Sequence, residues 1–401
     1  MNIASKVFCR IFQKCFHIAI PILPYRTPKI LDSVALVPGE FMSRGVSKIL
    51  IVTDSFIGQS HGMELLKEAL TQQKVDFVIF DKTRPNPTVS DVEEARRLYI
   101  DNGCEGIVGF GGGSAMDCAK AVGARIARPG KSIQKMEGIL SVIKKLPPLI
   151  AIPTTAGTGS ETTVTFVITD DETHHKFPVS DFPMIPIAAV LDPENTRTLP
   201  KHLTATTGMD ALTHAVEAYI GGSTTKDSRK NALCATKLIS ENLLKCYENG
   251  DDMTARRNML LASFYAGAAF SKSYVGYCHA VAHSLGGKYN IPHGLANATL
   301  LPKTLEIYGE CAYKKLKDLA VAFGASEKDT DEKTAAENFI KKLYEYNEKM
   351  GIPKTFPEIN KEDVPALSKI AAKEANPLYP VPKLMNAEEI QEIYFSVCEN
   401  K

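Results

Sequence analysis

Short apolar runs alternate with amphipathic segments along the first half of the chain. The runs VSKILIVTD and CEGIVGF have the length of buried strands, whereas GMELLKEALTQQ, VSDVEEARRLYIDNG and SAMDCAKAVGARIA carry apolar residues at helical spacing. Strands that alternate with helices of about ten to fifteen residues are typical of a parallel sheet covered on both faces. We therefore expect an α/β domain with a doubly wound parallel sheet over residues 30–197, and Ser90 or Asp91 as the cap of its second helix.

The second half of the chain has a different pattern. Segments such as TKLISENLLKCYENG, ARRNMLLASFYAGAAFS and AAENFIKKLYEYNEKMG show long helical periodicity, and strand-like runs almost disappear. This change predicts an all-α domain over residues 198–401. Because no low-complexity linker separates the halves, we expect them to pack closely, and a cleft between two such domains is a usual place for a ligand.

Residues 1–29 form an extension before the first expected domain. Lys6, Arg10 and Lys14 recur every four residues and share one face of a helix, apolar residues cover the other side, and the extension contains no acidic residue. Three interpretations stay open: a helix docked on its own protein or on a partner subunit, a membrane-surface anchor through residues 1–25, or a targeting peptide. No apolar stretch reaches the ~18 to 20 residues that a membrane span needs.

The composition narrows the range of partners. Lys plus Arg number 47 and Asp plus Glu number 46, so the formal net charge is +1 and no basic stripe predicts a nucleic-acid partner. The nine cysteines form neither a CxxC pair nor an even framework, which favours free thiols and a cytoplasmic protein. Cys278 lies beside a histidine cluster and offers a thiolate there, but we expect it to be a buried small side chain.

A glycine-rich turn joins an expected strand to an expected helix in GIVGFGGGSAMDCAK. The turn consists of Gly111, Gly112, Gly113 and Ser114. Glycine lets the backbone approach a bulky anion closely, and a helix N-terminus offers unpaired N–H groups with a partial positive charge. The turn therefore fits a diphosphate, but it is not the GxGxxG fingerprint, and a plain tight turn is the alternative.

A second turn of small and hydroxyl-bearing residues follows the next strand, in PTTAGTGSE. Its hydroxyl groups belong to Thr154, Thr155, Thr158 and Ser160. Open α/β sheets bind ligands at the carboxyl ends of their strands, so two such turns indicate a nucleotide site. Asp54 ends an earlier strand, where a carboxylate accepts hydrogen bonds from a ribose 2′-hydroxyl and repels a 2′-phosphate; a turn cap is its alternative role.

An aspartate and four histidines recur at close spacing in the second half. TGMDALTHAVEAY places Asp210 and His214 one helical turn apart, HAVAHSLGG does the same for His279 and His283, and His293 follows in the loop-like NIPHG. One carboxylate and three imidazoles suit Fe²⁺ or Zn²⁺, and they leave an open position when the ion takes five or six ligands. The spacing does not decide whether His279 or His283 stays outside the donor set, and hydrogen-bonded core histidines are the alternative.

Together these motifs resemble the iron-containing (group III) alcohol dehydrogenases, the family of lactaldehyde reductase and propanediol dehydrogenase. The likeness runs from about residue 30 to the C-terminus and rests on PNPT, GGGSAMDCAK, TTAGTGSE, GMDALTHAVEAY and HAVAHSLGGKYNIPHG. It implies a dinucleotide-binding domain, a helical domain of the dehydroquinate synthase-like type, and a metal ion in the cleft between them. It also implies NAD(H)-linked, metal-dependent interconversion of a small alcohol and an aldehyde, and a homodimer.

The resemblance also assigns roles to single residues by motif position. The metal ligands that it implies are Asp210, His214, His279 and His293. His283 then matches an additional histidine near the nicotinamide and substrate, and is our candidate catalytic residue. The implied cofactor-binding residues are Asp54, Asn86, Gly111, Gly112, Gly113, Ser114, Asp117, Thr154, Thr155, Thr158, Thr165 and Lys176. NADP(H) is less favoured because of Asp54, and Thr165 stands where many members carry asparagine.

Several alternatives accompany this expectation. Phe270, in AGAAFSKSYVG, is either part of the substrate wall or an ordinary helix-packing residue. Glycerol dehydrogenases and dehydroquinate synthases share the two-domain plan, and a metal- or NAD-binding scaffold without activity would carry the same ligands. A synthase with a polyanionic substrate needs several basic residues near the metal, but the motifs supply mainly Lys272 and Lys288. The favoured expectation is an NAD-dependent alcohol dehydrogenase.

Overall fold

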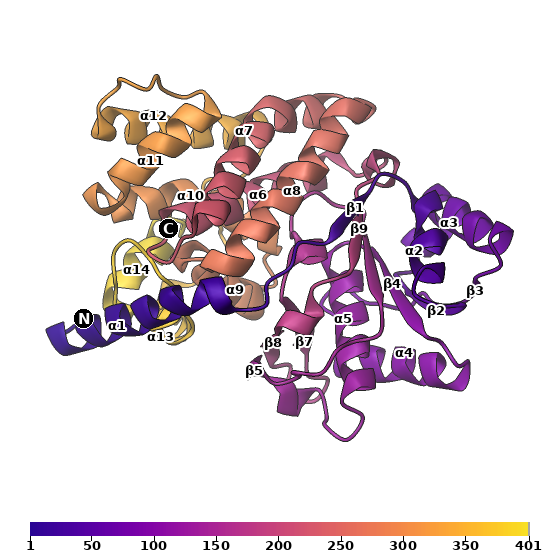
Figure 1. The fold of residues 1–401 in the computed structure, drawn as a ribbon. Helices are drawn as coiled ribbons and strands as arrows, with labels where there is room; N and C mark the ends of the chain where they lie inside the picture. The colour runs from indigo at the N-terminus through magenta and orange to yellow at the C-terminus, as the bar shows by residue number, and fades with distance from the viewer. Residues whose placement is uncertain (400–401) are drawn as a thin grey trace. The chain divides into compact units, whose positions relative to one another are not determined.

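The computed structural model describes residues 1–399, which divide into two compact units (Figure 1). The α/β unit is Pro24–Leu199, and the helical unit consists of Met1–Leu23 together with the chain from Pro200 onward. The N-terminal segment therefore belongs to the same unit as the second half of the chain.

Six parallel strands form the main sheet of the α/β unit, in the order β1-β9-β6-β4-β2-β3. These strands are β1 (Lys29–Leu31), β2 (Lys48–Val52), β3 (Asp76–Phe80), β4 (Gly106–Gly111), β6 (Leu149–Pro153) and β9 (Ala188–Val190). Strands β3 and β4 lie on opposite sides of β2, so the winding reverses between β2 and β4. The carboxyl ends of strands at such a reversal are where open α/β sheets bind their ligands.

Helices cover both faces of this sheet, as the sequence predicted. In β2, the side chains of Ile49 and Ile51 pack into one core, whereas those of Leu50 and Val52 pack into the other. This alternation follows from the two-residue period of a strand, and a strand buried on both faces reads as a continuous apolar run. Helices α2 and α3 close the first core and α4 and α5 the second; they are α2 (Val37–Met42), α3 (His61–Gln72), α4 (Val89–Asp101) and α5 (Gly113–Ala127).

A second, three-stranded sheet lies outside what the sequence predicted. The run FVIT lies in β7 (Thr165–Thr169), which pairs antiparallel with β8 (Lys176–Ser180), and β8 also pairs with β5 (Gly138–Ile139). In β8 only Phe177 and Val179 are buried apolar residues, and they alternate with exposed positions. So short a half-buried strand gives little apolar signal, which explains why the sequence pattern did not reveal it.

Helix α4 is capped by a residue other than those we expected. Its N-cap is Thr88, whose hydroxyl accepts a hydrogen bond from the Asp91 N–H, while the Asp91 carboxylate accepts one from the Thr88 N–H. The prediction of Ser90 or Asp91 as the cap is therefore wrong. Asp91 is instead the third helical residue and completes a reciprocal capping box, a role that serine or threonine and an acidic residue often share.

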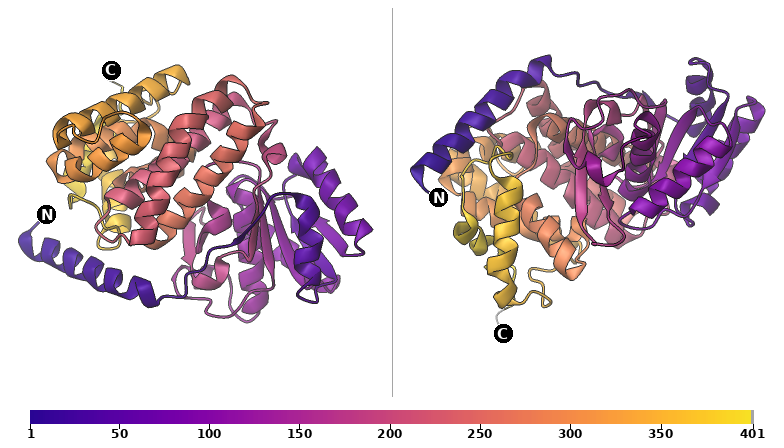
Figure 2. Two further views of the ribbon diagram at one scale, coloured as in Figure 1. Left: turned by 45° about the horizontal axis from the view of Figure 1, so that its top comes forward. Right: turned by 90° about the horizontal axis from the view of Figure 1, so that it is seen from below.

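The described part of the helical unit contains ten α-helices and no strand, and Figure 2 shows how these helices pack. They are α1 (Ile3–Ala19), α6 (Lys201–Ile220), α7 (Lys226–Glu248), α8 (Met253–Ser273), α9 (Tyr277–Tyr289), α10 (His293–Tyr308), α11 (Glu310–Phe323), α12 (Glu332–Lys349), α13 (Val364–Ala375) and α14 (Ala387–Phe395). His293, which we expected in a loop, is the first residue of α10. Across residues 1–399, no helix combines the length and hydropathy needed to cross a bilayer.

Helix α6 is the innermost helix of this unit and packs against α7, α8 and α10. Every residue from 208 to 220 is buried, including three with a carboxylate or imidazole side chain: Asp210, His214 and Glu217. Buried polar groups are costly unless they find partners or ligands. Since these three residues are spaced i, i+4, i+7, they share one side of the helix, and the site is built there.

Candidate metal centre and nucleotide-binding loops

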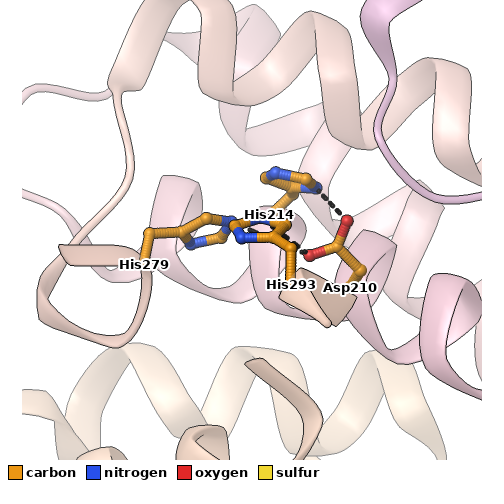
Figure 3. A group of neighbouring side chains, drawn as sticks. All are labelled: Asp210, His214, His279 and His293. Carbon is orange, nitrogen blue, oxygen red and sulfur yellow. Dashed lines mark ion pairs between the residues drawn. The ribbon is translucent and has the colours of Figure 1, made fainter. Parts of the chain in front are cut away.

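Four side chains from three helices converge in the helical unit (Figure 3). Asp210 and His214 come from α6, His279 from α9, and His293 from the start of α10. One ligand-type atom from each lies within 4.8 Å of those of the other three. Ligands that each sit ~2.0 to 2.2 Å from one ion are separated by no more than roughly 4.4 Å, so the group is close to the spacing that a single divalent ion requires.

The carboxylate of Asp210 is the common neighbour of the three rings. Its Oδ1 lies 3.5 Å from Nε2 of His293 and 4.0 Å from Nε2 of His279, and its Oδ2 lies 4.0 Å from Nδ1 of His214. Asp210, His214 and His279 are buried, whereas the His293 side chain is 37% exposed. A buried set that is open on one side leaves room for a further ligand.

Glu217 holds the ring of His279 from behind. Its Oε2 lies 2.6 Å from Nδ1 of His279, and the carboxylate also accepts hydrogen bonds from the N–H groups of Gly276 and Cys278 at the start of α9. The opposite ring atom, Nε2 of His279, is buried without a hydrogen-bond partner among the described residues. A histidine that binds metal through one nitrogen typically offers the other to a carboxylate, so this arrangement fits a metal ligand.

The pKa shifts of His279 and Glu217 are consistent with a metal-binding role for His279. Burial, together with the neighbouring rings of His214, His293 and His283, lowers the pKa of His279 well below its usual value and keeps the ring neutral. A metal ligand must be neutral imidazole, so the protein maintains this ring in the binding form. Burial raises the pKa of Glu217 to about 7, against the lowering effect of its backbone hydrogen bonds.

Asn297 links two of the four donors from the next turn of α10. Its Nδ2 donates to Oδ1 of Asp210 at 2.7 Å and lies 3.1 Å from Nε2 of His293. Asn297 is fully buried, so its rotamer is fixed by packing. Our reading of the sequence missed both Asn297 and Glu217, although each follows a candidate ligand at a helical interval: four residues after His293 and three after His214.

His283 lies outside the four-residue group. It is one turn beyond His279 on α9, its ring stacks on that of His293 with centroids 5.1 Å apart, and 42% of the side chain is exposed. Its Nδ1 lies 2.7 Å from Oε1 of Glu374, and the Tyr379 hydroxyl donates to the same oxygen at 2.8 Å. The spacing alone left His279 and His283 open, whereas the resemblance implied His279 as the ligand; in the structure His279 lies in the group and His283 beside it. Glu374 gave no sequence signal, because it is 91 residues away from His283.

Phe270 and Cys278 flank the group in different ways. The half-buried ring of Phe270 stacks on His214, with centroids 4.2 Å apart and an interplanar angle of 16°. Cys278 is fully buried and its thiol donates weakly to the Asn297 carbonyl at 3.6 Å. Burial raises the pKa of this thiol well above its usual value, so Cys278 is a buried small side chain and not a thiolate.

In the α/β unit, the two predicted turns lie side by side. The Thr154 N–H donates to the Gly111 carbonyl at 3.0 Å, which fixes the second turn against the first. A Cβ on Gly113 would stand 2.9 Å from Cγ2 of Thr158, and Gly111 has φ +153°, so both positions require glycine. Close by, Oγ1 of Thr155 is buried without a hydrogen-bond partner among the described residues. Ser114 follows within the first turn of α5, whose N-terminus faces these loops.

Asp54 caps a turn and also lies beside the glycine turn. Its Oδ1 accepts hydrogen bonds from the N–H groups of Phe56 and Ile57, both at 2.9 Å, so it caps the turn after β2. Its other oxygen, Oδ2, lies 3.5 Å from the position of a Cβ on Gly111. One carboxylate oxygen therefore holds the loop while the second faces the glycine turn.

The remaining predicted cofactor residues are tied to one another or to the loops. Lys176 donates to Oδ1 of Asn86 at 2.8 Å, and burial lowers the pKa of Lys176. Asp117 accepts hydrogen bonds from the Ser160 hydroxyl and the Val167 N–H, and so joins α5 to the second turn and to β7. The Thr165 hydroxyl pairs with that of Ser180 at 2.7 Å, which occupies it within the small sheet.

Comparison with known proteins agrees with this architecture. Residues 31–193 match the family model for iron-containing alcohol dehydrogenase, and residues 204–398 match the model for the C-terminal part of the same family. The chain is 37% identical to an NAD-dependent methanol dehydrogenase of Bacillus methanolicus over 82% of this chain and 86% of that protein. It is 34% identical to a 1,3-propanediol dehydrogenase of Citrobacter freundii, over 95% of this chain and 98% of that protein.

Solved structures share the whole fold. A 1,3-propanediol oxidoreductase superposes with a TM-score of 0.89 at 33% identity and covers 94% of this chain and 98% of its own. An alcohol dehydrogenase from Oenococcus oeni gives the same TM-score and identity, over 94% of this chain and 100% of its own. The predicted fold class, a doubly wound parallel sheet followed by a helical region, is confirmed.

Proposed function

The chain belongs to the iron-containing alcohol dehydrogenase family, and on that premise we propose that it interconverts a short alcohol and the corresponding aldehyde with NAD(H). The observation that carries the proposal is the convergence of one carboxylate and three imidazoles on a single point. We propose that Asp210, His214, His279 and His293 bind one divalent ion, Fe²⁺ in the first place and Zn²⁺ as the alternative. Both ions accept oxygen and imidazole donors.

The fit of the donor set is supported by what surrounds it. His279 presents a buried Nε2 that has no hydrogen-bond partner among the described residues, and Glu217 fixes the tautomer that leaves this atom available. Three protein nitrogens and one oxygen leave one or two positions open on a five- or six-coordinate ion. When bound, the ion supplies Lewis acidity to the substrate oxygen.

The two turns of the α/β unit fit a dinucleotide. The backbone at the N-terminus of α5 carries no side chains at Gly111, Gly112 and Gly113. A diphosphate can therefore approach the N–H donors and the partial positive charge of the helix N-terminus. The Thr155 hydroxyl, buried without a partner among the described residues, is available to a phosphate oxygen.

We propose residues 30–197 as the cofactor-binding part and 198–401 as the metal-binding part. We also propose NAD(H) over NADP(H), because the Asp54 carboxylate would repel a 2′-phosphate.

His283 is the group we propose to move the proton. Its Nδ1 is engaged by Glu374, so Nε2 is the nitrogen that takes the alcohol proton or returns it to the alkoxide. Phe270, stacked on His214, forms part of the wall against which a short aliphatic chain packs.

A single assay separates this function from its rivals. The protein is supplied with Fe²⁺ under anaerobic conditions, or with Zn²⁺, together with NADH and a panel of short aldehydes, and the loss of the reduced-nicotinamide absorbance is followed. We expect oxidation of NADH that requires both metal and aldehyde and that a chelator abolishes. Absence of turnover with every aldehyde would favour a synthase-like enzyme or a non-catalytic scaffold.

A further inference from the structure

Helix α1 is attached to the helical unit by its polar side. Gln13 is only 5% exposed, and its Nε2 donates to the carbonyls of Pro377 and Tyr379 at 3.0 and 2.8 Å. The Arg10 guanidinium donates to the carbonyls of Val381 and Pro382 at 2.8 and 2.9 Å. These bonds join α1 to the segment between α13 and α14. The buried Cys9 and the edge-to-face contact of Phe16 with Tyr274 add apolar packing on the same side of the helix.

The outer side of α1 is apolar and exposed. Figures 1 and 2 both show the helix along the outside of the helical unit, with no other element of the unit over its outer face. The large apolar side chains there are Ile3 (82% exposed), Val7 (51%), Phe8 (60%), Ile11 (58%), Phe12 (39%), Ile18 (67%) and, just beyond the helix, Ile22 (84%). Surface helices normally turn their apolar stripe inward, and a large exposed apolar patch marks a binding surface.

Basic side chains border this apolar face. Lys6, Arg10 and Lys14 lie one turn apart along one flank, and Lys6 and Lys14 are exposed. No acidic residue occurs in the first 31 positions; the acidic contact made by this segment is between the terminal amine and Glu389, at 3.4 Å. An exposed apolar stripe with a cationic flank is the pattern of helices that lie in the surface of anionic membranes.

We propose that the outer face of α1 docks this protein on the surface of a bilayer that contains anionic phospholipids. The helix would lie parallel to the membrane, with Phe8, Ile11 and Ile18 among the acyl-chain boundary and Lys6 and Lys14 at the headgroups. Because hydrogen bonds already hold α1 folded on its own unit, binding does not require a disordered segment to become helical. The 17 helical residues, about 25 Å long at 1.5 Å per residue, provide a peripheral contact.

Charge distinguishes a lipid surface from a second copy of the chain. A two-fold symmetric pairing through α1 would bring the same patch from each subunit together, and Lys6, Arg10 and Lys14 would meet their own counterparts. Like charges in such an interface oppose association. Anionic headgroups instead neutralise these side chains while the acyl chains cover the apolar residues.

The test is flotation of the full-length protein with vesicles. We expect co-flotation with vesicles of phosphatidylglycerol mixed with phosphatidylcholine, and none with phosphatidylcholine alone. Raising the ionic strength to 1 M, where the Debye length falls to about 3 Å, should weaken binding strongly. The variant Lys6→Gln/Lys14→Gln should bind about thirtyfold more weakly, since each basic residue near an anionic surface contributes about a fivefold factor.

A second variant tests the apolar part. Phe8→Ser/Ile11→Ser should abolish flotation, whereas the matched variant Phe56→Ser/Ile370→Ser, which removes the same side-chain types from exposed positions elsewhere, should float like the parent. Circular dichroism and melting temperature confirm that each variant is folded. The proposal is overturned if the parent does not float with anionic vesicles. It is equally overturned if Phe8→Ser/Ile11→Ser shifts a dimer to a monomer in sedimentation velocity, since a second copy would then cover the face.

Discussion

The helical unit and the α/β unit prepare their ligand sites in opposite ways. In the helical unit, four candidate donor side chains converge, and three of them contact the buried Glu217 or Asn297. In the α/β unit, the first loop lacks side chains, because Gly111, Gly112 and Gly113 have no Cβ atom and leave the backbone N–H groups uncovered. A metal ion needs directed lone pairs, whereas a diphosphate needs access to N–H groups.

This difference predicts which binding property a substitution in each unit should impair. Removing one of the four candidate donors should take away a bond to the proposed ion. Adding a methyl group to a glycine loop blocks an approach without touching the metal. Substitutions in the two units should therefore separate into loss of metal and loss of cofactor affinity, and each prediction below tests that separation.

The largest effect is expected from removing a donor. His214→Ala should abolish stoichiometric metal binding and lower kcat/KM by more than about a thousandfold, since Lewis acidity contributes several kcal/mol and about 4 kcal/mol corresponds to that factor. His202→Ala, an exposed histidine on the same helix, is the matched control. Elemental analysis and steady-state kinetics measure both quantities. Full metal content in His214→Ala would contradict the assignment.

The next effect concerns the proton and not the ion. His283→Ala should lower kcat by about a hundredfold, the lower range for a general acid or base, with metal content unchanged. The two histidines differ in place: His279 is 2% exposed and lies within the donor group, while His283 is 42% exposed and lies beside it. Loss of metal from His283→Ala would show that the two roles are reversed.

Substituting the carboxylate partners of His279 and His283 separately tests the same difference between a metal ligand and a proton-transferring histidine. Glu217→Gln should weaken metal affinity by roughly 10- to 100-fold, because the ligand ring loses its charged partner. Glu374→Gln, which removes the equivalent partner of His283, should leave metal affinity unchanged and lower kcat. Competition with a chromogenic chelator gives the affinities. Equal metal affinities in the two variants would remove the proposed role of Glu217.

In the α/β unit, Gly112→Ala should raise KM for NADH about tenfold, which is about 1.4 kcal/mol. The nearest atom to a Cβ there is 3.7 Å away and φ is −73°, so the substitution fits the protein itself and only a ligand should meet it. Gly130→Ala, where nothing lies within 4 Å, is the control. Metal content should be unchanged in both variants, and a normal KM in Gly112→Ala would place the diphosphate elsewhere.

The smallest effect is expected at Asp54. Asp54→Asn keeps an oxygen to cap the N–H groups of Phe56 and Ile57 but removes the negative charge. The ratio of kcat/KM for NADH over NADPH should fall about fivefold, or about 1 kcal/mol, with melting temperature unchanged. An unaltered ratio would mean that the carboxylate only caps the turn.

Local periodicity explains what could be predicted from the sequence. The donors Asp210 and His214 are one turn apart on one helix, and the parallel sheet follows from apolar runs that alternate with helices. Glu217 and Asn297 also follow the candidate donors at helical spacing, but spacing alone does not show that they are buried beside them. They were missed because a buried carboxylate or amide is recognisable only once its neighbours are known.

Contacts between distant segments explain what could not be predicted. Glu374 meets His283 across 91 residues, and Gln13 meets the carbonyl of Tyr379 across 366. Strand β8 has too short an apolar pattern to stand out from a loop. The orientation of α1 was also hidden, since its helical pattern is the same whether the apolar side or the polar side faces the protein.

The central claim is that one carboxylate and three imidazoles hold a single divalent ion. The most direct measurement is X-ray absorption of the metal-loaded protein, combined with anomalous diffraction at the metal edge. It should show one Fe²⁺ or Zn²⁺ per chain within about 2.0 to 2.2 Å of three nitrogens and at least one oxygen, from His214, His279, His293 and Asp210. A crystal grown with excess Fe²⁺ or Zn²⁺ that holds the ion elsewhere, or holds no ion, would contradict a metal centre at these four side chains.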